Sequence, residues 1–241
     1  MSCSVEAFSH PSVKRAKVAI EKRCLFAPKV PTWIGLGRLQ QLLTVVMLKN
    51  ELREMMLLFI ASYAFLLRLP SEGLPMAALE MPQGLEGGKR VPVFRMLEDS
   101  QVEVWFPFRK HRLWPTHAAR GCWFAKCGMT CPVHILGAYM KSLAPGTQPF
   151  AHISSRRALS TLRSLLIELG VPNATKHGSH GFRRGHAEDL HKGGARLQEI
   201  LAAGDWKSAA FMIYLDRVGL ERDAVLEAQL SGLTDSEDEA D

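Results

Sequence analysis

Two stretches rich in strand-forming residues interrupt a chain whose apolar residues otherwise recur at helical spacing. They are RVPVFRM, residues 90–96, and QVEVWFPF, residues 101–108, separated by LEDS, which has turn chemistry. They predict a β-hairpin or a small antiparallel sheet in the middle of the chain. The apolar spacing predicts helices over 37–50, 51–68, 132–143, 157–170, 180–193, 196–204, 208–215 and 221–230. The predicted fold class is therefore mainly α with one small antiparallel β-sheet, an α+β arrangement.

The most apolar run, from Met55 to Leu67, is shorter than the roughly 20 residues that a helix needs to cross a bilayer. We interpret it as a core helix surrounded by protein. The N-terminal residues lack the apolar region of a secretory signal, and the five cysteines favour a reducing compartment over a disulfide scaffold. We therefore expect no membrane partner and an intracellular location, which is the nucleus in a eukaryote and the cytoplasm otherwise.

The charge of the chain is unevenly distributed. The formal net charge is +6, but the last seven residues, DSEDEAD, carry five acidic groups, so the preceding part carries about +11. We expect residues 231–241 to form an acidic disordered tail. A body this basic favours a polyanion as partner.

The segment HGSHGFRRGHAEDL, residues 177–190, gathers histidines and arginines at the start of a predicted helix. His180 and Arg183 are three residues apart, so they project from the same face of that helix. The helix N-terminus adds unpaired backbone N–H groups and a favourable dipole. The segment therefore predicts an anion-binding site.

These residues carry a family resemblance. HGFRRGHAEDL, followed by EILAAGDWKSAAFMIYL, resembles the C-terminal half of the tyrosine recombinases, or phage integrases, which carry His-x-x-Arg, then His or Trp, then a nucleophilic Tyr. YAFLLRLPSEGLPM resembles that family's first-arginine motif, and the hairpin with FRKHR at its turn resembles the element that supplies the catalytic lysine. The resemblance covers roughly residues 35 to 220. The pattern W-x-S-x-A-F-x-x-Y-L is especially similar to recombinases of eukaryotic mobile elements.

The resemblance implies a fold and an activity. The chain would have the tyrosine recombinase catalytic-domain fold and would be a site-specific recombinase or integrase that breaks and rejoins DNA through a covalent 3′-phosphotyrosyl intermediate. Arg68 and Arg183 would clamp the non-bridging oxygens of the scissile phosphate, which suits guanidinium groups because they donate two hydrogen bonds and keep their charge. Glu72 would orient these residues without contacting the phosphate itself.

The remaining catalytic roles are also implied by the resemblance. Tyr214 would attack the phosphorus, His180 would assist proton transfer at the Tyr hydroxyl, and Lys110 would protonate the leaving 5′-oxygen. Trp206 would pack against the phosphate or donate its indole N–H to it. This chemistry requires neither a metal nor a nucleotide cofactor.

The resemblance further implies a domain organisation and partners. Residues 1–34 would be the remnant of a core-binding domain with its linker, 35–230 the catalytic domain, and 231–241 the acidic tail. Double-stranded DNA would be the partner, and the helix over 221–230 could mediate homo-oligomers on DNA. Because most of the family's N-terminal DNA clamp would be absent, we expect reduced affinity for DNA. Whether the chain cleaves DNA does not follow from the resemblance.

Two other functions compete with the recombinase. The chain could be a catalytically inactive DNA-binding protein that retains the recombinase fold. Alternatively, it could be a structural or regulatory helical domain stapled by zinc, whose resemblance to recombinases is historical only.

A cysteine-rich segment bears on the last alternative. Cys122, Cys127, Cys131 and His134 offer four soft ligands within thirteen residues, enough for a tetrahedral structural zinc site. The spacing is not a standard CxxC pair, so reduced and partly buried thiols remain the competing interpretation.

Overall fold

The computed structural model describes residues 32–46, 49–81, 90–98, 101–109, 114–122 and 130–206, all within the unit Thr32–Asp241. The predicted helices over 208–215 and 221–230, the N-terminal segment 1–31 and the acidic tail lie outside these residues. The boundaries predicted for the three domains stay predictions.

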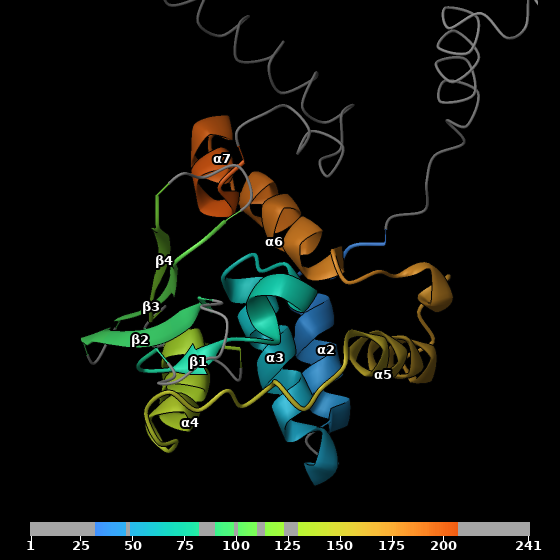
Figure 1. Ribbon diagram of the computed structural model, residues 1–241. Coiled ribbons are helices and arrows are strands. Elements are labelled where there is room, and N and C mark those ends of the chain that lie inside the picture. The colour runs from blue at the N-terminus through green and yellow to red at the C-terminus, as the bar shows by residue number, and fades with distance from the viewer. Residues whose placement is uncertain are drawn as a thin grey trace, which may run out of the picture. The chain divides into compact units, whose positions relative to one another are not determined.

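A buried helix forms the centre of the described fold (Figure 1). Helix α3, Arg53–Ala64, follows α2, Leu36–Val46, and the short 3-10 turn η2, Asn50–Leu52. Every residue of α3 from Met55 to Ala64 is buried, which confirms the interpretation of this run as a core helix. Such a helix needs no polar face because protein surrounds it.

The predicted helix over 51–68 is four residues too long at its C-terminal end. Helix α3 ends at Ala64, and Leu66 adopts a left-handed backbone conformation with φ of 49°. The LPSEG segment then forms a π-helical turn, η3, Leu69–Gly73. The chain therefore turns first at Leu66 and again in η3, which contains Glu72. Arg68 lies between these turns, in an extended conformation immediately before η3.

The sheet has four strands in the order β1-β2-β3-β4, which are Ala77–Ala78, Val93–Glu98, Gln101–Phe106 and Thr116–Gly121. Strands β2, β3 and β4 pair antiparallel, whereas β1 pairs parallel to β2, so the sheet is mixed. The β2–β3 hairpin confirms the sequence prediction. The sequence pattern predicted no strand where β4 forms. Its sequence, THAARG, has few strand-forming residues and no buried ones, which is why its pattern failed to indicate a strand.

The second half of the described chain is helical. After the π-helical turn η5, Pro132–Leu136, come α4, Gly137–Lys141, α5, Ser155–Glu168, the 3-10 turn η6, Ala174–Lys176, α6, Gly181–Lys192, and α7, Leu197–Gly204. Ser154 caps α5 by accepting a hydrogen bond from the backbone N–H of Arg157 at 3.1 Å. The helical character predicted for these segments is confirmed, with small shifts at the ends.

Helix α6 packs on the central helix and on the segment that leads into α2. Phe182 stacks on Phe59 of α3 with ring centroids 4.9 Å apart. The backbone N–H of Ile34 donates to the carbonyl oxygen of Gly181 at 2.9 Å. Gly185 permits this crossing, because a Cβ atom there would overlap the backbone of Ile34 and Gly35.

Asp189 fastens the same crossing from the next turn of α6. Its Oδ2 accepts hydrogen bonds of 2.6 Å from the backbone N–H of Leu36 and from the hydroxyl of Tyr63 on α3. One carboxylate thus joins α2, α3 and α6. Among the helices of the described part of the chain, none is long and apolar enough to span a membrane.

Candidate functional site

A buried carboxylate stands at the centre of a cluster of arginines. Glu72, 3% exposed, accepts hydrogen bonds from the backbone N–H of Arg68 at 2.8 Å and from its Nη1 at 3.2 Å. Arg109 donates to the same carboxylate through Nε at 3.2 Å and Nη2 at 3.3 Å. Glu72 therefore holds the guanidinium groups of Arg68, four residues before it, and of Arg109, 37 residues after it.

Arg109 is a member of this cluster that sequence reasoning missed, since only its neighbour Lys110 was selected from the basic turn. Its side chain is 4% exposed and lies over the ring of Phe106, 3.8 Å from the centroid. Its Nη1 also lies 3.8 Å from the carboxylate of Asp205, beyond the end of α7. Arg109 thus links strand β3 to both η3 and the C-terminal end of α7.

No simple pattern in the sequence indicated that Arg109 is buried. Apolar residues alternate along β3 at Val102, Val104 and Phe106, and continuing this pattern would bury Phe108 and expose Arg109. The structure has the reverse, with Phe108 73% exposed. The alternation breaks at Pro107, which cannot donate a ladder hydrogen bond.

Arg183 approaches the same region from the first turn of α6. Its Nη1 donates to the carbonyl oxygen of Leu66 at 2.8 Å, and its Nη2 donates to the carbonyl oxygen of Gly204. The guanidinium carbon lies 4.7 Å from the ring centroid of Trp206. With 3% of the residue exposed, Arg183 joins the turn after α3 to the end of α7.

His180 is the residue immediately before α6, one helical turn ahead of Arg183. The pKa of His180 is lowered below its ordinary value of 6.5, mainly because the side chain is partly buried. The charges of Arg183, Arg184 and Arg68 lower this pKa further, and the charge of Glu72 opposes the shift. The imidazole is therefore neutral at neutral pH and able to accept a proton.

The described residues thus bring together four of the predicted site residues, Arg68, Glu72, Arg183 and Trp206, with His180 within electrostatic reach. Lys110 and Tyr214 lie outside the described residues, so their positions and roles stay predictions.

Three guanidinium groups and two carboxylates make this cluster net cationic. Arg68 has the most accessible guanidinium of the three, with 28% of its side chain exposed, whereas Arg109 and Arg183 are almost fully buried. A guanidinium that is partly exposed and oriented by a buried carboxylate can donate two hydrogen bonds to an oxyanion. The arrangement is suited to binding a phosphate or another oxyanion at Arg68.

Three of the four predicted metal ligands also lie close together. Cys122, just after β4, and Cys131 and His134, at the start of η5, place their ligand atoms within 4.8 Å of one another. Cys127, the fourth predicted ligand, lies outside the described residues.

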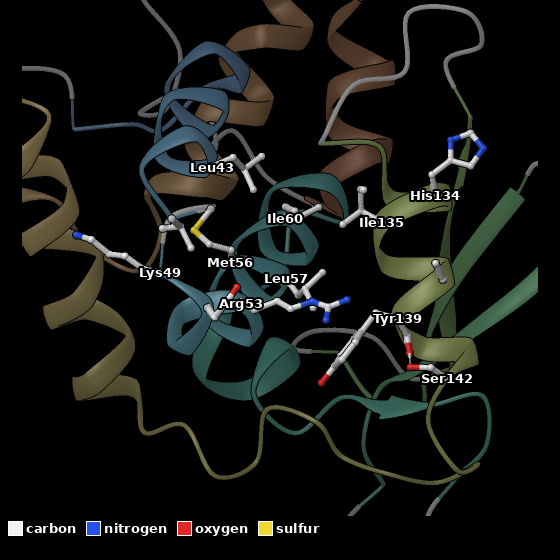
Figure 2. Close-up of a pocket in the computed structure, with 13 residues that line it drawn as sticks. Leu43, Lys49, Arg53, Met56, Leu57, Ile60, His134, Ile135, Tyr139 and Ser142 are labelled. Carbon is white, nitrogen blue, oxygen red and sulfur yellow. Dashed lines mark hydrogen bonds between the residues drawn. The ribbon is translucent and has the colours of Figure 1, made fainter.

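A separate pocket of about 440 Å³ lies between α2 and α3 on one side and η5 and α4 on the other (Figure 2). Its walls are mainly apolar, with Leu43, Met56 and Ile60 facing Ile135 and Tyr139. None of the predicted catalytic residues that the structure describes lines it. The pocket is therefore distinct from the arginine cluster.

The fold is similar to solved structures of one enzyme. The XerH site-specific recombinase bound to difH substrate, a pre-cleavage complex, has a TM-score of 0.52 at 15% identity, over 77% of this chain and 50% of that chain. The post-cleavage complex of XerH with palindromic difH substrate has a TM-score of 0.53 at 15% identity, over 81% of this chain and 53% of that chain.

The chain spans about half the length of the recombinase that it matches. Comparison with protein-family models and with curated proteins finds no match. The likeness in fold agrees with the order of elements described above, a core helix, a small sheet and then helices. The chain has the fold of a tyrosine recombinase catalytic domain.

Proposed function

We propose that the chain is a recombinase catalytic domain that breaks and rejoins double-stranded DNA through a covalent 3′-phosphotyrosyl bond to Tyr214. The observation that carries the proposal is the convergence of Arg68, Glu72, Arg183 and Trp206, from three separate segments, within a recombinase fold. An origin in a mobile element belongs to the same proposal.

The arginines supply the electrostatic part of the proposed reaction. Arg68, held by Glu72, would bind a non-bridging oxygen of the scissile phosphate, and Arg183 would bind the other after exchanging a backbone carbonyl for the phosphate. Catalytic hydrogen bonds in DNA-free enzymes are often incomplete and form only in the complex. Neutral His180 would accept the proton of the attacking hydroxyl.

The other two tyrosines of the chain are poor candidates for the nucleophile. Burial and a 2.6 Å hydrogen bond to Asp189 raise the pKa of Tyr63 above its ordinary value. Burial and a 2.8 Å hydrogen bond to Glu54 raise the pKa of Tyr139 in the same direction. A phenol whose pKa is raised is harder to activate by deprotonation, which leaves Tyr214 as the candidate.

A covalent trapping experiment tests this proposal. The probe is a pool of DNA duplexes with a randomised central sequence and a nick that lets the released strand end diffuse away, so that a cleaved complex cannot religate. We expect a protein–DNA adduct that survives denaturation, and we expect Tyr214→Phe to abolish it. Tyr139→Phe is the matched control, because it removes a hydroxyl that is bound to Glu54, and should keep the adduct.

A second function, DNA binding without strand cleavage, is favoured by one observation. Arg183 is 3% exposed and both of its terminal nitrogens donate to backbone carbonyls, an arrangement that suits a structural tie. In that case no adduct would form with any duplex of the pool, while salt-sensitive binding to the same duplexes would persist. Loss of both adduct and binding at low salt would contradict both functions.

A further inference from the structure

A second cluster of reactive side chains lies apart from the arginines. Cys122 follows the last residue of β4, Cys131 precedes the π-helical turn η5, and His134 lies within that turn. Cys131 is buried, Cys122 is half-buried and His134 is exposed. Strand β4 and η5 are also in direct contact, so the cluster sits where the sheet meets the helical half.

The distances within the cluster match those between the ligands of a tetrahedral metal site. The Sγ atoms of Cys122 and Cys131 are 3.9 Å apart, and the Sγ of Cys122 is 3.7 Å from Nδ1 of His134. Zinc bonds of about 2.3 Å to sulfur and about 2.0 Å to nitrogen, at tetrahedral angles, imply about 3.8 Å between two sulfurs and about 3.6 Å between sulfur and nitrogen. The ligand atoms of Cys131 and His134 lie within 4.8 Å of each other, so all three atoms are close enough to surround one ion.

The same distances show that Cys122 and Cys131 are not joined by a disulfide. A disulfide requires sulfur atoms about 2.05 Å apart, so the 3.9 Å between Cys122 and Cys131 is too long for one. Two thiols and an imidazole held this close fit a metal such as zinc, which prefers thiolate and imidazole ligands.

We propose that Cys122, Cys131 and His134 bind a structural zinc ion that joins the end of β4 to the start of η5. Structural zinc takes four ligands, and these residues supply three of them. The register pairs Gln101 with Gly121 and Phe106 with Thr116, so the ion would lie at the end of the β3–β4 hairpin away from Arg109. It would stabilise the sheet against α3, on which η5 packs, and would take no part in DNA chemistry.

Metal analysis of the full chain tests the proposal. The protein is purified under reducing conditions without chelators and is dialysed against buffer that has been depleted of metal. We expect about one zinc ion per chain. Substituting Co²⁺ should give the visible absorption of a tetrahedral thiolate site, and chelation should lower the Tm and expose the Cys122 and Cys131 thiols to alkylation.

Variants assign the ligands. His134→Ala should lose the zinc and the cobalt spectrum without unfolding, because this side chain is exposed, and Cys122→Ser should lose them as well. His117→Ala on the exposed face of β4 and Cys24→Ser are matched controls that should retain the metal.

Absence of zinc from the wild-type protein, even after incubation with Zn²⁺ and reductant, would overturn the proposal. It would also be overturned if His134→Ala held as much zinc as the wild type. The same holds if the Cys122 and Cys131 thiols became unreactive only on oxidation and regained their reactivity with reductant. The metal content is measured without DNA, so the outcome is independent of whether Tyr214 cleaves anything.

Discussion

Replacing Glu72 by glutamine would remove one negative charge from the centre of the arginine cluster while preserving the size of the side chain. Glu72 is 3% exposed, and the four hydrogen bonds that described residues donate to it come from Arg68 and Arg109. The amide can still accept a bond through its oxygen, but it presents N–H groups where the second oxygen stood. Glu72→Gln therefore leaves the buried Arg109 without its main compensating charge.

The size of the effect follows from burial. Breaking a buried ion pair by removing one partner costs about 3–5 kcal/mol, because the remaining charge stays desolvated. The Arg109–Glu72 pair is 4% exposed on both sides, but Asp205, 3.8 Å from Arg109, supplies partial compensation. The pair with Arg68 adds less, since the Arg68 side chain is 28% exposed. We expect Glu72→Gln to lower the free energy of unfolding by about 3 kcal/mol.

The chain offers a matched control that has the same chemistry at the surface. Glu168 and Lys49 form an ion pair at 2.6 Å, shorter than the 3.2 Å between Arg109 and Glu72, but their side chains are 47% and 35% exposed. Exposed pairs contribute about 0–1 kcal/mol, so Glu168→Gln should lower the stability by less than that. The comparison separates the effect of burial from that of distance.

Urea unfolding followed by circular dichroism measures both variants, and a double-mutant cycle with Arg109→Gln isolates the pair. The double variant should lose clearly less stability than the sum of the two single variants, because neither charge is left buried alone. If Glu72→Gln cost no more than Glu168→Gln, or if the two substitutions were additive, the assignment of Glu72 as the buried anchor of Arg109 would be wrong.

Three further predictions concern His186, Gly185 and His180. Burial and a nearby guanidinium lower the pKa of His186 to about 3, so the unfolded state takes up a proton first as pH falls below about 6.5. The free energy of unfolding should then decrease by up to about 1.4 kcal/mol per pH unit. In urea titrations, His186→Gln should flatten this slope. Gly185→Ala should destabilise the fold by about 1–3 kcal/mol or more because its Cβ would overlap the backbone of Ile34. Gly37→Ala is the control: its Cβ meets no neighbouring atom, so it should stabilise the fold by up to about 1 kcal/mol. Equal effects of the two substitutions on Tm would contradict this packing. Burial and neighbouring arginine charges lower the pKa of His180. If protonation of His180 stops adduct formation, the yield of adduct should fall with a midpoint below about pH 6.5. A midpoint above that value would argue against His180 as the proton acceptor.

The fold could be predicted from the sequence where periodicity was strong. The core helix around Met55–Ala64, the β2–β3 hairpin and the helix that begins at Gly181 all follow from apolar spacing and turn chemistry. Strand β4 could not be predicted, because an edge strand without buried residues takes its conformation from the hydrogen bonds of its neighbour.

The sequence named candidate site residues, whose roles stay predictions, but it did not indicate their contacts. The motifs placed Arg68, Arg183 and Trp206 in one cluster, since their order along the chain matched a known pattern. The ties of Arg183 to backbone carbonyls and the burial of Arg109 were not predictable. Both depend on tertiary contacts between segments 21 or more residues apart, which no local pattern records.

The crossing of residues 32–35 over α6 has a mechanical consequence. A pull on the chain at Thr32 would be resisted first by the hydrogen bond from Ile34 to Gly181 and then by the bond from Leu36 to Asp189. Both anchors belong to α6, the helix whose first turn carries Arg183. Tension at Thr32 would therefore load the same helix that positions Arg183.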